Sequence, residues 1–154
     1  MAFHVLLVCS GNTCRTAMAE GTLRALLDGA ERSDVDVTSA GTLGIVGAPA
    51  TPEAVAVAAE AEVDISTHRS SALTPERVEA ADLVLAMAEH HMRSILGVAP
   101  GAAPKTHLLS EYAGHGDEDV PDPIGGDVDE YRRSYELIRR LLEGALPKIL
   151  EGIS

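Results

Sequence analysis

A cysteine and an arginine stand close together near the start of the chain, in the spacing C-x5-R, with Thr16 directly after the arginine. Cys9 follows an apolar run, Val5–Val8, that predicts a buried strand, and a helical pattern begins at Arg15. A strand, a compact loop and a helix N-terminus in that order surround one point with backbone N–H groups and a positive helix dipole, which suits a tetrahedral dianion. The same potential favours the thiolate form of Cys9, and Arg15 can bind two oxygens at once. The segment therefore predicts a phosphate site that carries a nucleophile.

The residues between the cysteine and the arginine complete this predicted phosphate-binding loop. Gly11 permits a backbone conformation that a side chain would resist. The alternative interpretation is a buried cysteine beside a capped helix, since C-x5-R also occurs by chance. Its position between a strand and a helix favours the phosphate site. The predicted phosphate-binding residues are Ser10, Gly11, Asn12, Thr13, Cys14 and Arg15.

A thiolate that attacks phosphorus needs a proton donor for the leaving group, and the candidate is Asp122. Pro121 and Pro123 flank it and restrict the backbone of its loop. The alternative is an ordinary turn residue, because Asp-Pro is common in loops. Taken alone, the sequence around Asp122 leaves both interpretations open.

Composition narrows the class of protein. The chain has 154 residues, 45% hydrophobic and 23% charged, which predicts a single globular domain over residues 1–154. Its net charge of −12 argues against nucleic-acid binding and against binding to an anionic membrane. No apolar stretch reaches transmembrane length, and the first one lacks the charged flank of a signal peptide. Both cysteines lie in the opening loop rather than in a disulfide framework, so we expect a cytoplasmic protein.

Strands and helices alternate along the chain, which predicts an α/β fold: a parallel sheet with helices on both faces. Right-handed crossovers would place the loop after the first strand at the carboxyl edge of the sheet, where such folds bind ligands. A Thr-Pro-Glu cap signal opens two of the helices. Strands are expected at Phe3–Val8, Asp34–Ser39, Leu83–Met87 and His107–Leu109, helices at Arg15–Asp28, Thr51–Ala61, Thr74–Ala81, Glu89–Leu96 and Val128–Leu150, and a loop at Glu111–Gly126.

The opening segment VLLVCSGNTCRTAMAEG resembles the signature of the low-molecular-weight protein tyrosine phosphatases, V-C-x-G-N-x-C-R-S-P-x-A-E. The similarity continues in order through Ser39–Thr42, His68, Asp82–Met87 and Asp122-Pro123, and so covers nearly the whole chain. The resemblance implies a four-stranded parallel sheet in the flavodoxin-like order 2-1-3-4, flanked by helices. It also implies phosphorylated proteins or peptides as substrates, no cofactor and a monomer.

The resemblance also implies roles for individual residues. Cys9 would attack phosphorus and form a phosphocysteine, Arg15 would bind the phosphoryl oxygens, and Asp122 would protonate the leaving group and then activate water. The residues expected to brace the loop and support the thiolate are Asn12, Thr16, Ser39 and His68.

No metal ion is implied either, and the sequence shows no convincing cluster of ligands. His90 and His91 are adjacent on a predicted helix, so they point in different directions, and we expect both on the solvated surface.

Substrate choice is expected to depend on Thr13, where tyrosine phosphatases of this family usually carry an aliphatic residue. They also place aromatic residues after Asp-Pro, where this chain has Ile124-Gly125. The run Gly11–Arg15 instead resembles the bacterial protein-arginine phosphatase branch, as do His68-x-Ser-Ser and the later Asp-Pro-x-Gly-Gly. A Thr13 hydroxyl can form a hydrogen bond near a guanidinium that a larger aliphatic group would crowd. Phosphoarginine in proteins is therefore the expected substrate, and phosphotyrosine is the alternative.

Three further interpretations concern the loop. By the resemblance, Cys14 could form a reversible disulfide with Cys9 and protect it from overoxidation, or it could simply fill space. A thiol-dependent arsenate reductase would share the loop, but that class needs further cysteines and none follows Cys14. A phosphate-binding module without activity would lack a nucleophile, clamp or acid, and this chain has all three.

Overall fold

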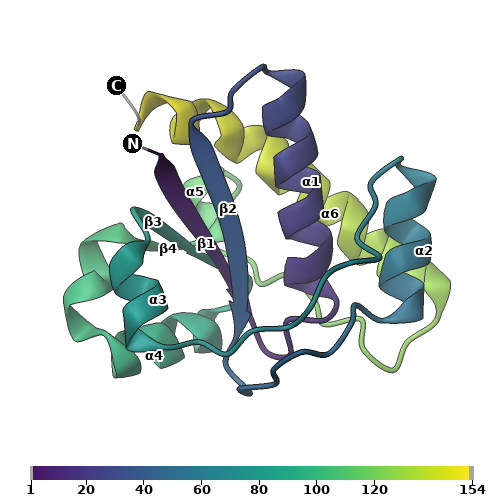
Figure 1. The fold of residues 1–154 in the computed structure, drawn as a ribbon, viewed down its shortest axis with the longest axis horizontal. Coiled ribbons are helices and arrows are strands. Elements are labelled where there is room, and N and C mark those ends of the chain that lie inside the picture. Colours follow the sequence, from purple (N-terminus) through teal and green to yellow (C-terminus); the bar gives the residue numbers. More distant parts are fainter. Residues whose placement is uncertain (1, 153–154) are drawn as a thin grey trace.

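The computed structural model describes residues 2–152. Four parallel strands form one sheet in the order β2-β1-β3-β4, which confirms the predicted order 2-1-3-4 (Figure 1). Their bounds are β1 Phe3–Cys9, β2 Val35–Gly41, β3 Leu83–Ala86 and β4 Thr106–Leu108. Cys9, at the carboxyl end of β1, is in register with Gly41, at the carboxyl end of β2.

Helices cover both faces of the sheet, as predicted (Figure 1). One face carries α1 (Arg15–Gly29), α2 (Pro52–Glu60) and α6 (Val128–Glu151). The other carries α3 (Pro75–Ala80), α4 (Glu89–Val98) and the 3-10 helix η1 (Pro100–Lys105). The short helix α5 (Leu109–Tyr112) follows β4 directly. No helix among residues 2–152 is both long and apolar enough to cross a membrane.

The central strand β1 is buried on both faces, and its side chains alternate between two apolar cores. Val5 and Leu7 pack with the inner faces of α1, α2 and α6. Leu6 and Val8 pack with residues of α3, α4 and η1. This is why the strand has an unbroken apolar sequence rather than an alternating one. The stripe predicted on the last helix, which includes Tyr131, is also buried.

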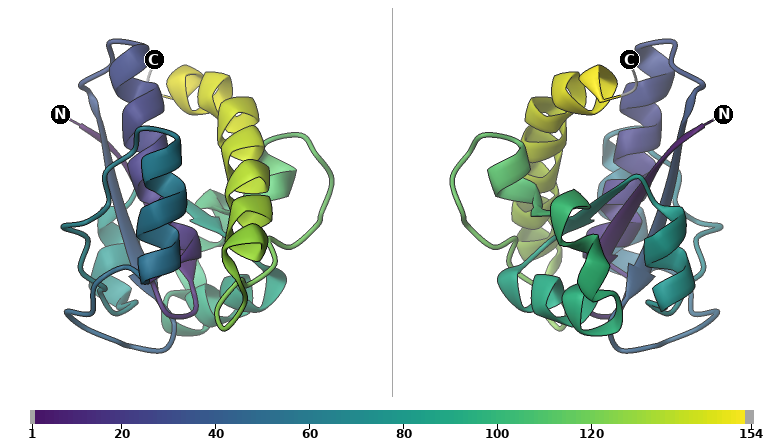
Figure 2. Two further views of the ribbon diagram at one scale, coloured as in Figure 1. Left: turned by 90° about the vertical axis from the view of Figure 1, so that its right-hand side faces the viewer. Right: turned by 90° about the vertical axis from the view of Figure 1, so that its left-hand side faces the viewer.

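The local start signals act as predicted. Thr51 accepts a hydrogen bond from the backbone N–H of Ala54 and caps α2. Thr74 accepts one from the backbone N–H of Arg77 and caps α3. One boundary prediction was wrong in element type: β4 ends at Leu108, and Leu109–Tyr112 forms α5 rather than the end of a strand and the start of a loop. Other ends differ by one or two residues, as in β2, which was predicted to end at Ser39 and ends at Gly41. The loops after β1 and β2 and the loop before α6 gather at one end of the molecule (Figure 2).

Candidate active site

The loop between β1 and α1 holds its carbonyl groups outward. The carbonyls of Cys9 and Ser10 accept hydrogen bonds from the backbone N–H groups of Thr42 and Leu43, at 2.9 and 3.0 Å. The carbonyl of Thr13 accepts one from the N–H of Thr51, at 2.9 Å. Because a trans peptide directs its C=O and N–H to opposite sides, these contacts turn the loop's N–H groups toward its centre. The backbone is thereby arranged to bind an anion.

The thiol of Cys9 lies inside this loop and is 1% exposed. Its Sγ is 3.0 Å from the Oγ1 of Thr16, and it accepts a hydrogen bond of 3.3 Å from the backbone N–H of Asn12. Thr16 is fully buried in the first turn of α1. The N–H of Asn12 is therefore directed at the sulfur, and the Thr16 hydroxyl can be a second donor to it.

Asn12 connects the loop to its surroundings and adopts the left-handed conformation, with φ of +59°. Its Nδ2 donates to the Oγ1 of Thr16 and to the Oγ of Ser39, both at 2.8 Å. Its Oδ1 accepts from the backbone N–H of Ser71 at 2.8 Å, and its carbonyl oxygen lies 2.7 Å from Nε2 of His68. The structure thus brings together all four residues that the sequence assigned to loop support.

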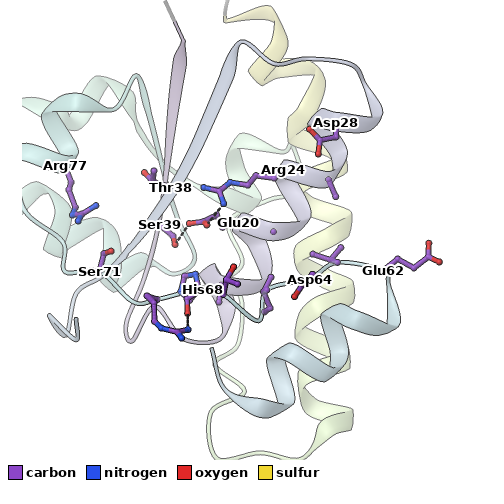
Figure 3. Close-up of a pocket in the computed structure, with 17 residues that line it drawn as sticks. Glu20, Arg24, Asp28, Thr38, Ser39, Glu62, Asp64, His68, Ser71 and Arg77 are labelled. Carbon is purple, nitrogen blue, oxygen red and sulfur yellow. Dashed lines mark hydrogen bonds and ion pairs between the residues drawn. The ribbon is translucent and has the colours of Figure 1, made fainter. Parts of the chain in front are cut away.

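This network continues behind the loop into a cavity of about 400 Å³ (Figure 3). Ser39 donates to the Oε1 of Glu20 at 2.7 Å, and Glu20 forms an ion pair of 3.1 Å with Arg24. The cavity is lined by Ser39 and His68 but by no residue of the segment 9–15. It therefore lies beyond the bracing residues and is separate from the anion-binding centre.

Arg15 is 3% exposed, and its guanidinium connects the loop to the Asp122 segment. Nη1 donates to the carbonyl of Val120 at 3.0 Å, and Nη2 donates to the Oγ of Ser10 at 3.3 Å. Nη2 also lies 3.4 Å from Oδ2 of Asp122, whose side chain is 39% exposed. The predicted nucleophile, clamp and acid therefore meet at the carboxyl end of β1.

Cys14 lies on the same side of the loop as Asp122, with its Sγ 3.7 Å from Oδ1 of the aspartate. Burial, reinforced by the nearby Cys9 and Asp122, raises the pKa of Cys14 to about 11. Cys14 therefore remains a neutral thiol at physiological pH.

The rim of the site is aliphatic. Ile124, which follows the Asp-Pro pair, is 58% exposed, and Leu43 and Val46 of the loop after β2 are 68% and 76% exposed. Tyr131 is 1% exposed, and its hydroxyl accepts a hydrogen bond from Thr51 at 3.2 Å. Thr13, between Asn12 and Cys14 in the loop, is 8% exposed. The exposed side chains named here are therefore aliphatic, whereas Tyr131 is buried.

The prediction for His91 was wrong. His90 is exposed, as expected, but His91 is fully buried, and its Nε2 lies 2.9 Å from the Oγ of Ser10. Sequence reasoning missed this residue, although a signal existed. His91 is four positions before the buried Ile95 and therefore shares the inward face of α4.

Within residues 2–152, no group of three or more His, Cys, Asp or Glu side chains is placed to hold a metal ion. The chemistry that the site can perform is that of a thiolate, a guanidinium and a carboxyl group around an anion. That set suits attack on a phosphoryl group and protonation of its leaving group.

Comparison with known proteins agrees with this geometry. Residues 4–153 match the model of the low molecular weight phosphotyrosine protein phosphatase family, and the chain belongs to that family. A protein-arginine-phosphatase of Bacillus subtilis is 38% identical over 90% of this chain and 91% of its own length. A low molecular weight protein tyrosine phosphatase from T. tengcongensis superposes with a TM-score of 0.90, at 39% identity, over 96% of this chain and 99% of the other.

A third relative bears on the reaction. The YwlE arginine phosphatase, solved as a cysteine-to-serine mutant with a phosphorylated active-site serine, has a TM-score of 0.90. It is 36% identical over 97% of this chain and 96% of the other. A covalent phosphoryl intermediate on the loop nucleophile is consistent with the family's mechanism.

Proposed function

We propose that this chain is a phosphatase for phosphoarginine in proteins. The observation that carries the proposal is the polar, buried Thr13 in an anion-binding loop whose rim is aliphatic. The similarity to the arginine phosphatases of Bacillus subtilis and Geobacillus stearothermophilus supports it. The second candidate substrate is phosphotyrosine, which the name of the T. tengcongensis relative favours.

The reaction runs in two steps. The thiolate of Cys9 attacks phosphorus, the P–N bond breaks, and the proton of the Asp122 carboxyl passes to the departing guanidine nitrogen. The Asp122 carboxylate then takes a proton from water, whose oxygen attacks the phosphorus of the phosphocysteine. The P–S bond breaks, and inorganic phosphate and the Cys9 thiolate are released. In both steps Arg15 and the loop N–H groups bind the phosphoryl oxygens where negative charge develops.

Thr13 discriminates between the two substrates through its hydroxyl. A guanidinium carries several N–H donors that lose water in the site, and each one left without an acceptor costs free energy. The Thr13 hydroxyl and the carbonyl oxygen of the Asp122 carboxyl supply acceptors, whereas an aliphatic residue at position 13 would supply none. A phenyl ring needs no such acceptor and gains instead from aromatic walls, where this chain has Ile124 and Gly125 after Asp122-Pro123.

Matched phosphoarginine and phosphotyrosine peptides test the substrate. The wild type should prefer phosphoarginine in kcat/KM, and Thr13→Ile should shift the ratio toward phosphotyrosine by roughly ten- to hundredfold. Thr13→Val, which removes the hydroxyl at nearly constant shape, should shift it in the same direction, and Thr13→Ser should retain the wild-type order. A wild type that prefers phosphotyrosine would overturn the assignment to phosphoarginine.

We also propose that Cys14 protects Cys9 during oxidation. Peroxide would convert the Cys9 thiolate to a sulfenic acid, and the Cys14 sulfur would then displace the hydroxyl as water to give a disulfide. The neutral state of Cys14 makes this step slow at neutral pH and faster toward pH 11. After peroxide, dithiothreitol should restore the wild type but not Cys14→Ser; equal recovery of both would exclude the disulfide.

Three further properties belong to the proposal. We expect residues 1–154 to act as one domain, as a monomer and in the cytoplasm, on phosphorylated proteins. Light scattering measures the oligomeric state, limited proteolysis tests for a second domain, and cell fractionation tests the location.

A further inference from the structure

His91 contacts the phosphate-binding loop from the opposite side of the sheet. It lies in the first turn of α4 and is fully buried, and its Nε2 lies 2.9 Å from the Oγ of Ser10. Its other ring nitrogen, Nδ1, is buried and has no hydrogen-bond partner among the described residues. Ser10 is therefore the polar contact that accounts for a histidine at this position.

The contact continues from Ser10 to the phosphate clamp. Nη2 of Arg15 lies 3.3 Å from the same Oγ, and because a guanidinium can only donate, Ser10 accepts this hydrogen bond. Burial, together with the positive charges of Arg15 and His90, lowers the pKa of His91 to about 3, although Asp119 and Asp122 act in the opposite direction. A neutral imidazole can hold the Ser10 hydroxyl without adding a second positive charge beside Arg15.

Ser10 and Asp122 contact the same atom of the clamp. Nη2 of Arg15 is 3.3 Å from Ser10 and 3.4 Å from Oδ2 of Asp122. If the Ser10 hydroxyl turned away, Nη2 would retain only the carboxylate, and the guanidinium would be drawn toward the acid. Such a shift would move the guanidinium away from the phosphoryl oxygens and weaken phosphate binding.

We propose that His91 is a positioning residue that fixes the Ser10 hydroxyl and, through it, holds the Arg15 guanidinium toward the phosphoryl group. The inference rests on the proposed phosphatase function and adds to it a residue that never touches the substrate. It is distinct from a packing role on α4, which the apolar Ile95 performs on the same face.

Four variants test the connection: His91→Phe, which keeps a ring without nitrogen; His91→Gln, whose amide offers both a donor and an acceptor and can therefore replace Nε2 in either tautomer; Ser10→Ala; and the double variant His91→Phe with Ser10→Ala. His91→Phe should lower kcat/KM and weaken inhibition by inorganic phosphate by roughly ten- to hundredfold, the effect of one hydrogen bond to a charged group. The double variant should be no worse than the poorer single variant, and His91→Gln should recover most of the loss.

Phosphate binding is measured independently of turnover as the rise in melting temperature that inorganic phosphate produces. This readout separates the two proposals, because a wild type without phosphatase activity overturns the function but still reports whether His91 holds the clamp. His90→Phe, at the exposed neighbouring position, is the matched control and should behave as the wild type.

Two results would overturn the role of His91. One is wild-type phosphate binding in folded His91→Phe. The other is a double variant whose loss of phosphate binding equals the product of the His91→Phe and Ser10→Ala losses, because the two residues would then act independently of each other. If His91→Phe does not fold, His91→Gln and the double variant His91→Gln with Ser10→Ala decide. Phosphate binding should be nearly wild type in His91→Gln and should fall to the Ser10→Ala level in the double variant. Any other pattern overturns the role.

Discussion

Nη2 of Arg15 and Oδ2 of Asp122 lie 3.4 Å apart, although one residue begins α1 and the other precedes α6. The arginine is almost fully buried, and the aspartate is partly exposed at the mouth of the site. The contact places Asp122, the proposed proton donor, beside Arg15, the proposed clamp for the phosphoryl oxygens. In the proposed reaction, the Cys9 thiolate would attack phosphorus and the Asp122 acid would protonate the leaving group, as in-line displacement requires.

Replacing the proposed acid, Asp122, should lower kcat most for the substrates with the poorest leaving groups. Asp122→Asn keeps an oxygen that can accept from Arg15 but has no proton to donate to the leaving group. We expect kcat on phosphoarginine peptides to fall by roughly 10²- to 10⁴-fold, and kcat on an aryl phosphate with a good leaving group to fall much less. Asp117→Asn, on the same exposed loop, is the control. Equal losses on both substrates would contradict an acid role.

The conformation and the hydrogen bonds of Asn12 can be tested separately. Asn12→Gly removes the three side-chain hydrogen bonds but tolerates a φ of +59°, so it should lower both kcat/KM and stability. Asn12→Ala should be less stable than Asn12→Gly by about 1 kcal/mol, the cost of a left-handed residue with a Cβ. Urea unfolding measures the difference. Glu31→Gly, at another positive φ remote from the site, should leave activity unchanged.

Most of the fold followed from local patterns. The continuous apolar run of β1, the caps Thr51 and Thr74 and the stripe of α6 each depend on neighbouring residues, so a single sequence contains them. The end of β4 could not be predicted from such local patterns. Leu108 and Leu109 are both fully buried, and apolar periodicity cannot distinguish the last residue of a short strand from the first residue of a helix.

The site was harder to predict, because its contacts join distant segments. Cys9 and Arg15 are close in sequence, and their spacing, set between a predicted strand and a predicted helix, indicates a phosphate loop. The bond between Asn12 and Ser39, by contrast, depends on the parallel pairing of β1 with β2. His91 was misassigned because two adjacent histidines on a polar helix look solvated, and only the helix orientation shows which one faces the loop.

Gly41 is a position where the backbone of β2 approaches the loop too closely for a side chain. A Cβ there would lie 2.6 Å from the carbonyl oxygen of Ser10 and 3.0 Å from the carbonyl carbon of Gly11. Gly41→Ala should therefore displace the loop, cost about 1–3 kcal/mol of stability and lower kcat/KM. Gly97→Ala, in α4 with open space around it, should instead be stabilising by about 0.5–1 kcal/mol. Chemical denaturation and initial rates measure both.

Buried, neutral His91 should make the protein sensitive to acid. Its pKa is about 3 in the folded protein and near 6.5 in the unfolded chain, so the unfolded chain binds its proton first as the pH falls. The stability that His91 contributes is thus complete above pH 6.5 and is lost progressively from there toward pH 3, by at most about 1.4 kcal/mol for each pH unit. Urea unfolding between pH 7 and pH 4 should show a steeper loss for the wild type than for His91→Phe, because carboxylates common to both cancel in the comparison. Parallel curves would mean that His91 already carries a proton in the folded protein, and a charged imidazole beside Arg15 would then have to be held by Asp119 and Asp122.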